Sequence, residues 1–331
     1  MGKQNDVLLD YFDDNERFAD LYNATLFGGR QVINPGQLED ASERYTQRSG
    51  DKKGNAAYRA RFRDVKKRLR DGGTLRILAL EAQELVDYSM PLRCMNYDVQ
   101  EYLKQMRRIQ AANDRTGAYR TPSERLCRLL KSDRLHPVYT ICLYHGMEEW
   151  DGPVSLGGMM DFGDGPEDFR ACFQDYSFAL VRGNRPLDYE NFRTSLREVL
   201  EILPYRRDKK KLTELVNGRE AYRSLDRETM EVISVMTNNR KLMEDAEAYR
   251  VGESYNMCEA LEGIKEDGIE IGMKKGMKKG VEKGIRGMVS ALRECGVTDG
   301  IIRKKLIEKF ALPEGKAEMF LQNTERTEEI K

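Results

Sequence analysis

Residues 74–83 (TLRILALEAQ) constrain the possible folds of this chain most strongly. They follow a turn signal, Asp-Gly-Gly at 71–73. Both alternating faces of the segment carry apolar side chains, namely Leu75, Ile77, Leu78, Ala79 and Leu80. A strand that is apolar on both faces is typical of the centre of a sheet covered by helices on both sides. We therefore expect an α/β fold with residues 74–83 as a central strand.

A second strand is predicted at residues 138–144 (VYTICLY), because this β-branched and aromatic run is bounded by Pro137 and Gly146. A short, weak strand is expected at Val32-Ile33. Helical spacing of apolar residues predicts three helices, over 7–27, 91–111 and 123–131. With a further strand at 64–70, the main elements follow the order helix (7–27), three strands, helix (91–111) and strand (138–144). This order gives a mixed sheet flanked by helices.

The helix at 91–111 should begin with Pro91 in its first turn. Its apolar stripe consists mostly of Leu92, Met95, Val99, Leu103 and Met106. Residues 55–63 stay ambiguous, because their apolar positions fit a helix face and also one face of a strand. Residues 166–255 look mostly helical, with 190–202 and 230–249 as the best helical stretches.

Residues 268–284 carry a glycine at every fourth position. An apolar residue follows each of these glycines, at Ile269, Met273, Met277, Val281 and Ile285. Each interior glycine costs a helix roughly 1 kcal/mol relative to alanine. One explanation is a close helix–helix contact, such as one between two copies of the chain, and the other is a solvated, flexible linker. Interleaved lysines exclude a membrane-spanning GxxxG helix.

The predicted domains are an α/β domain at 1–165, a helical region at 166–255, the glycine-periodic segment at 256–287 and a small helical segment at 288–331. The chain has 331 residues, of which 40% are hydrophobic, enough for a real core. Its 56 basic and 56 acidic residues cancel, so any nucleic-acid-binding surface must be local.

The six cysteines are scattered without a CxxC pair, and we recognise no signal peptide or membrane span. A reducing, cytoplasmic location and no membrane partner are therefore expected. Cys142 and His145 have the spacing of a zinc half-site, but a second pair is missing, so the end of a strand is the simpler interpretation.

Chemistry is predicted where residues 64–70 and 75–83 form an antiparallel hairpin. If Arg70 faces Leu75, Asp64 lies opposite Glu81, and Gln83 shares a face with Glu81. Facing carboxylates repel each other, and a carboxylate in an apolar strand is costly unless it is paired. A hard cation relieves both problems, and Mg²⁺ binds with one or two carboxylates plus phosphate oxygens. The alternative is that Glu81 and Gln83 face solvent and Asp64 caps another element, since a register slip of one residue would reverse its face.

This arrangement resembles the PD-(D/E)XK nuclease core, which has a restriction-endonuclease-like fold. More narrowly, the chain resembles the bacterial recombination-promoting nuclease/putative transposase family. The resemblance covers most of residues 1–160 and recurs in the glycine-periodic tail. It is carried by RFRDVKK (61–67), LALEAQELVDYSMPLRCMNYD (78–98) and HPVYTICLYHGMEEWDGPVSL (136–156).

The resemblance implies that Asp64 and Glu81 bind Mg²⁺, with Mn²⁺ as a substitute, and that Gln83 completes the catalytic set in the position of the motif lysine. Glutamine keeps the hydrogen-bonding capacity but lacks the charge. Arg63 also stands where the motif has proline. An additional acid from the first helix is expected, and the candidates are Glu16, Asp20 and Glu39.

Basic residues near the motif suggest contact with DNA phosphates, with Arg61, Arg63, Lys66 and Arg93 as the main candidates. His136 and His145 flank the second strand, and a structural role is favoured over that of a catalytic base. The leading hypothesis is a DNA endonuclease linked to mobile DNA or recombination. The alternatives are a catalytically degenerate module that binds DNA or protein, and an assembly protein built on the glycine-periodic helix.

Overall fold

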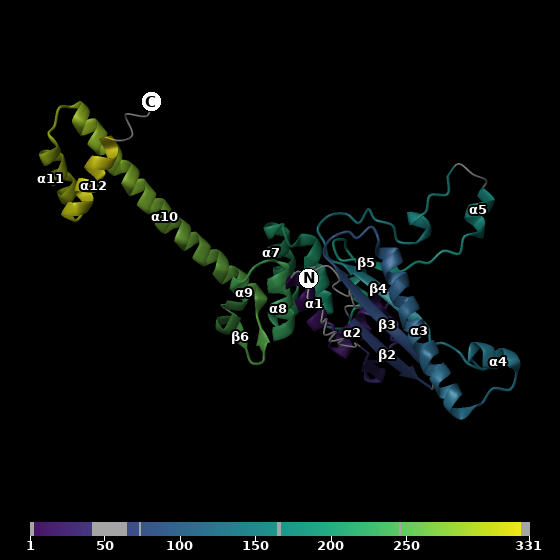
Figure 1. Cartoon of the computed structure of the whole chain (residues 1–331). Coiled ribbons are helices and arrows are strands. Elements are labelled where there is room, and N and C mark those ends of the chain that lie inside the picture. The colour runs from purple at the N-terminus through teal and green to yellow at the C-terminus, as the bar shows by residue number, and fades with distance from the viewer. Residues whose placement is uncertain (1–2, 42–64, 73, 164–166, 245, 326–331) are drawn as a thin grey trace. The chain divides into compact units, whose positions relative to one another are not determined.

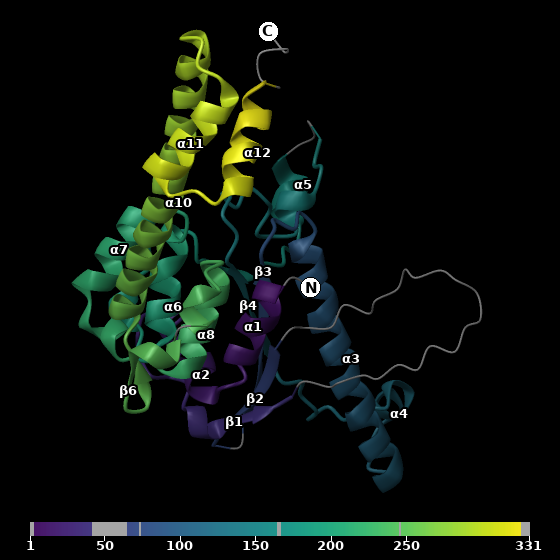
Figure 2. The ribbon, with the colours of Figure 1, turned by 90° about the vertical axis from the view of Figure 1, so that its left-hand side faces the viewer.

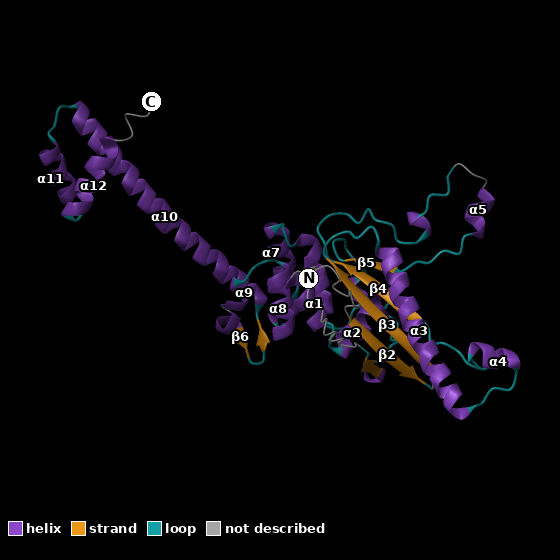
Figure 3. Cartoon of the chain, viewed as in Figure 1, coloured by secondary structure: helices purple, strands orange, loops and turns teal. Residues whose placement is uncertain are grey.

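The computed structural model describes residues 3–41, 65–72, 74–163, 167–244 and 246–325 (Figure 1). The chain forms two compact units, residues 1–260 and 261–331. The fold of the first unit is α/β, with one main sheet and helices packed beside it (Figure 3).

The sheet of the first unit has five strands in the order β1-β2-β3-β4-β5. Strand β2 pairs antiparallel with both β1 and β3, whereas β4 pairs parallel with both β3 and β5. The predicted mixed sheet is therefore confirmed. The strands are β1 (Leu38–Asp40), β2 (Val65–Asp71), β3 (Thr74–Gln83), β4 (Val138–Tyr144) and β5 (Ala179–Arg182). The central strand and the strand at 138–144 have the predicted bounds. Strand β5 was not predicted, and it lies within the region expected to be mostly helical.

The β2–β3 hairpin has the predicted register. Arg70 pairs with Leu75, and Val65 pairs with Leu80. Gly72 has a φ of +53°, which suits a tight turn between the strands. The register is thus confirmed for residues 65–71, whereas Asp64, Arg61 and Arg63 lie outside the described residues, as does the ambiguous segment 55–63.

The first strand lies at 38–40 rather than at Val32-Ile33, where the prediction was wrong. The side chain of Asn23 explains the difference, because it satisfies the backbone groups that a strand partner would need. Its Oδ1 accepts hydrogen bonds from the N–H groups of Val32 (3.1 Å) and Ile33 (2.9 Å). Its Nδ2 donates to the carbonyl of Ile33 at 2.9 Å. A side chain distant in sequence therefore holds this segment as a loop.

Two helices, α1 (Lys3–Tyr11) and α2 (Asn15–Thr25), replace the single helix predicted at 7–27. The break occurs because Asp14 caps α2, accepting a hydrogen bond from the N–H of Arg17 at 2.9 Å. Both helices cover one face of the sheet (Figure 2). Tyr22 ties α2 to the two central strands by donating to the carbonyls of Ala79 (2.7 Å) and Tyr139 (3.0 Å). The two helices and the turn between them bury the side chains of Leu8, Phe12, Phe18 and Leu21 completely.

Helix α3 (Met90–Thr116) covers the opposite face of the sheet (Figure 2). It is longer than the predicted 91–111 and ends at Gly117, whose φ of +62° closes the last turn. Met90 and Cys94 pack with Cys142 and Tyr144 of β4. The short helix expected next is α4 (Pro122–Cys127), which begins with a capping box formed by Thr121 and Glu124.

The remaining helices of the first unit follow β4 and lie mostly beside α1 and α2 (Figure 2). Helix α8 packs against α1, and α6 packs against α2 and α8. A two-stranded hairpin, β6 (Arg250–Val251) with β7 (Ser254–Tyr255), completes the unit. The helices are α5 (Glu167–Cys172), α6 (Leu196–Ile202), α7 (Lys209–Gly218), α8 (Arg227–Met236) and α9 (Lys241–Glu244).

The glycine-periodic segment lies within one long helix, α10 (Met257–Glu294). The end of α10 packs with α11 (Asp299–Phe310) and α12 (Glu314–Glu325), close to the predicted pair of helices at 288–321. The core of this second unit consists of Ile285, Val289, Ile302, Leu306, Ala317, Phe320 and Leu321. Within the described ranges, no helix combines the length and apolarity that crossing a membrane requires.

Candidate functional site

Glu81 and Gln83 lie at the carboxyl end of β3, on the sheet face that α3 covers. In the parallel pairing with β4, Glu81 stands beside Cys142 and Gln83 beside Tyr144. The Glu81 side chain is fully buried, whereas Gln83 is partly exposed. The two predicted residues therefore share one face at one edge of the sheet, which is where ligands bind in sheets with parallel strands.

Arg93 of α3 provides a positive charge for the buried carboxylate of Glu81. Its Nη2 donates to Oε2 of Glu81 at 2.7 Å, and its Nη1 donates to Oδ2 of Asp87 at 2.8 Å. Burial disfavours the charged guanidinium and lowers the pKa of Arg93. The nearby groups, first the carboxylate of Glu81 and then Tyr97 and Asp87, together outweigh burial, so the pKa of Arg93 is raised. Arg93, a predicted DNA contact, is thus engaged in ion pairs within the protein.

Lys66 and Lys67 point to opposite faces of β2. The Nζ of Lys66 lies 2.8 Å from Oε2 of Glu101 on α3, and both side chains are largely buried. The Nζ of Lys67 donates to the carbonyl of Asp13 at 2.5 Å and to Oδ1 of Asn15 at 2.6 Å, beneath the helices of the other face. Neither lysine therefore offers its charge freely to DNA in this structure, although Lys66 was predicted to do so.

Beyond Met90 and Cys94, the face of α3 that meets the sheet is largely polar, and this was not predicted. Asp98 accepts hydrogen bonds from the hydroxyls of Thr140 (3.1 Å) and Tyr176 (2.7 Å). Further along α3, Gln105 bonds the backbone of His136 twice. Its Oε1 accepts from the N–H of His136 at 2.8 Å, and its Nε2 donates to the carbonyl of His136 at 3.3 Å. We call the set Lys66, Glu81, Arg93, Asp98, Glu101 and Thr140 the polar α3 interface.

The apolar stripe predicted to hold α3 to the core faces outward instead. Leu92, Val99 and Leu103 are 52%, 42% and 38% exposed. The strands opposite α3 present Glu81, Lys66 and Thr140, so the acids and Arg93 of the helix turn toward them. A clue was present in the sequence, because Asp98, Glu101 and Gln105 recur at helical spacing on one side of the helix.

The acids considered for the first-helix position have other roles. Asp20 is 3% exposed, and its carboxylate accepts from the N–H groups of Arg193 and Thr194 and from the hydroxyl of Thr194, at 2.7–3.0 Å. Glu39 forms an exposed ion pair with Arg70 at 3.0 Å. Glu16 is exposed in the first turn of α2. The structure thus gives Asp20 a backbone-capping function.

Asn5 is the first-helix side chain that reaches the edge of the sheet. Its Nδ2 donates to the carbonyl of Ala82 at 3.3 Å, and its Oδ1 lies 2.6 Å from Nε2 of His145. Since the amide nitrogen is used at Ala82, Oδ1 accepts and Nε2 of His145 donates. Burial, followed by the charge of Arg206, lowers the pKa of His145 to about 4. His145 is therefore neutral at pH 7, in agreement with a structural role.

Of the two carboxylates predicted to hold Mg²⁺, the structure describes that of Glu81, which already bonds Arg93. Across the described part of the chain, no group of three or more His, Cys, Asp and Glu side chains is placed to hold a metal ion. The described residues thus supply one of the two expected ligands, because Asp64 lies outside them. On their own they do not form a complete metal site.

Comparisons of the chain with protein-family models, with curated proteins and with solved structures gave no match.

Proposed function

We propose that this chain is a metal-dependent DNA endonuclease with a PD-(D/E)XK core. It hydrolyses phosphodiester bonds of DNA, and its activity is linked to mobile DNA or recombination. The observation that carries the proposal is the register of the β2–β3 hairpin, which pairs Val65 with Leu80. The proposal extends this pairing by one residue, to Asp64 and Glu81. Two facing carboxylates would repel each other unless they shared a cation.

The order of elements supports the same proposal. Three antiparallel strands lead into α3, and β4 then returns parallel to the central strand. This order is the one that the resemblance to PD-(D/E)XK nucleases implies. The acidic residue and the glutamine stand at the carboxyl end of the central strand, where an elongated substrate can approach the edge of the sheet.

Each side chain of the site has a proposed role. Asp64 and Glu81 would hold Mg²⁺, which when bound supplies positive charge for the phosphate being cleaved. Gln83 would orient the attacking water or a phosphate oxygen through its amide, without contributing a charge. Arg93 donates to the carboxylate of Glu81 and fixes its orientation from α3.

A plasmid-nicking assay tests the proposal. The wild-type chain should convert supercoiled plasmid to open circles in Mg²⁺ and not in EDTA. Asp64→Ala and Glu81→Gln should each reduce the rate by at least about a hundredfold, as loss of a group that stabilises the transition state does. Asp20→Asn is the matched control, since this acid caps backbone groups. Equal background cleavage by wild type and Asp64→Ala would remove the enzyme proposal.

A second candidate function is favoured by one observation at the same place. Oε2 of Glu81 is engaged by Arg93, and the position of the motif lysine holds the neutral Gln83. A fold that kept the site's shape but lost its catalysis would act as a DNA-binding or protein-interaction module. DNA binding without Mg²⁺-dependent nicking is the result that would favour this function.

A further inference from the structure

Strand β5 places an arginine in the same transverse row as Gln83. Gln83 pairs with Tyr144 of β4, and Tyr144 pairs with Arg182 of β5. Paired residues of neighbouring parallel strands project from the same face, and neighbouring strands lie about 4.8 Å apart. The Cα atoms of Gln83 and Arg182 are therefore separated by about 10 Å, two strand spacings.

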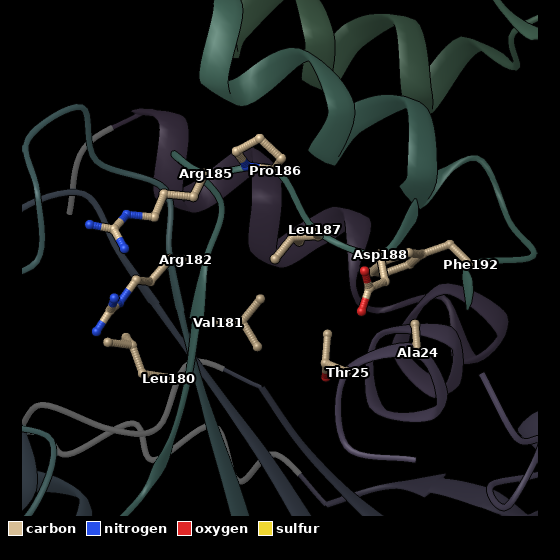
Figure 4. Close-up of a pocket in the computed structure, with 10 residues that line it drawn as sticks. All are labelled: Ala24, Thr25, Leu180, Val181, Arg182, Arg185, Pro186, Leu187, Asp188 and Phe192. Atoms are coloured by element: carbon tan, nitrogen blue, oxygen red, sulfur yellow. The ribbon is translucent and has the colours of Figure 1, made fainter. Parts of the chain in front are cut away.

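The side chains around β5 agree with this assignment (Figure 4). A cavity of about 380 Å³ lies along β5 and is bordered by Val181, Ala24 of α2 and Phe192, and also by Leu180, Arg182 and Arg185. Within it, Val181 points toward α2. Leu180 and Arg182 point the other way, away from α2. Arg182 thus projects from the face of the sheet that carries Glu81 and Gln83.

Arg185 adds a second positive charge beside Arg182. The two guanidinium groups are directed to the same side in Figure 4. Arg185 pairs with Glu149 at the surface, where both side chains are at least half exposed. The Arg182 guanidinium is half-buried and forms no hydrogen bond or ion pair with any residue that the structure describes. An anion close to both groups would relieve their mutual repulsion.

The basic residues nearer to Glu81 differ in this respect. Lys66 is bound to Glu101, and Arg93 is bound to Glu81 and Asp87. Arg182 of β5 and Arg185 in the turn after it add positive charge to this face that is not held by Glu81, Asp87 or Glu101. A guanidinium also suits phosphate, because its planar fork can donate two parallel hydrogen bonds.

We propose that Arg182, supported by Arg185, binds a backbone phosphate of DNA next to the phosphate that lies over Gln83. This inference rests on the proposed nuclease function for its choice of DNA as the ligand. It assigns to β5 the phosphate contact that Lys66 and Arg93 were predicted to make.

DNA binding without metal separates this inference from catalysis. The full chain is titrated in EDTA against a fluorescently labelled DNA duplex at several salt concentrations, and anisotropy is recorded. Arg182→Ala should weaken binding about tenfold. It should also reduce the slope of log K against log salt by about one unit. Arg182→Lys should retain most of the slope.

Arg115→Ala is the matched control, because it removes the same charge from an exposed residue in the last turn of α3. It should leave both affinity and slope unchanged. Arg185→Ala provides a second readout if Arg182→Ala does not fold, and it should weaken binding in the same direction. Wild-type affinity and slope in both variants, or no binding by the wild type, would overturn the inference. Binding that depends on Arg182 without nicking in Mg²⁺ would leave it standing and remove only the proposed catalysis.

Discussion

The guanidinium of Arg93 holds the carboxylate of Glu81 at 2.7 Å, joining α3 to the central strand. Glu81 is fully buried and Arg93 is 15% exposed, so the pair is shielded from water. Removing one member of such a pair leaves an uncompensated buried charge. The ion pair is therefore both a stability element of the fold and a part of the candidate site.

Arg93→Met should lower the free energy of unfolding by about 3–5 kcal/mol. Adding Glu81→Met should recover much of that loss, because both charges are then absent. Urea denaturation of the four proteins in this double-mutant cycle measures the coupling. If the double variant were as unstable as the sum of the single ones, Arg93 and Glu81 would not form the pair described here.

The neutral state of His145 predicts how stability depends on pH. The pKa of His145 falls to about 4 in the fold, against an ordinary value near 6.5. Between these values the unfolded chain binds the extra proton, so stability decreases as pH falls through that range. At pH 7 and above both states are neutral and this contribution vanishes. The loss from pH 7 to pH 4 should reach about 3 kcal/mol.

His145→Gln should remove this part of the pH dependence, because glutamine does not titrate. The measurement is urea unfolding of both proteins at pH 7 and at pH 5, with the His145 ring followed by NMR. An ordinary His145 titration near pH 6.5 in the folded protein would contradict the buried Asn5–His145 contact.

The glycines of α10 should tolerate alanine. A Cβ added at Gly272 or Gly276 would meet no atom within 4 Å. Each substitution to alanine should therefore stabilise the helix by up to about 1 kcal/mol, measured by thermal denaturation of the full chain. Lower stability would indicate that these positions need the small residue, as a close contact with a second copy would require.

Self-association through α10 is the alternative account of its apolar residues, of which Ile269, Met273 and Met277 are 54%, 70% and 76% exposed. Light scattering before and after deletion of residues 266–287 tests this directly. The intact chain should have the larger number of copies, and an unchanged number would remove the idea.

Local patterns in the sequence were sufficient to predict the central strand, the strand at 138–144 and the hairpin register. Strand β3 is apolar on both faces, and the turn at 71–73 sets its pairing with β2. Asn23 shows what local patterns omit, because a side chain of α2 satisfies the N–H groups of Val32 and Ile33 and keeps them in a loop. Strand β5 has four residues, too few for a clear alternation.

The orientation of α3 could not be predicted from its hydrophobic residues. Beyond the first turns of the helix, the strands opposite it present the polar side chains of Glu81, Lys66 and Thr140. Glu81 was predicted as a functional residue, yet its consequence for α3, the inward turn of Arg93, was not. The pairing of Arg182 with Tyr144 likewise depends on β5 joining the sheet in parallel. Sequence therefore placed Glu81 and Gln83 on β3 and missed the partners brought to them by other elements.

The central claim is that Asp64 and Glu81 share one divalent cation at the edge of the sheet. Crystals of the full chain grown in Mn²⁺ test it most directly, because the ion is located by its anomalous scattering. The account predicts a peak within bonding distance of a carboxylate oxygen from each of the two residues. A map with no peak there, or with the two carboxylates too far apart to reach one ion, would contradict it.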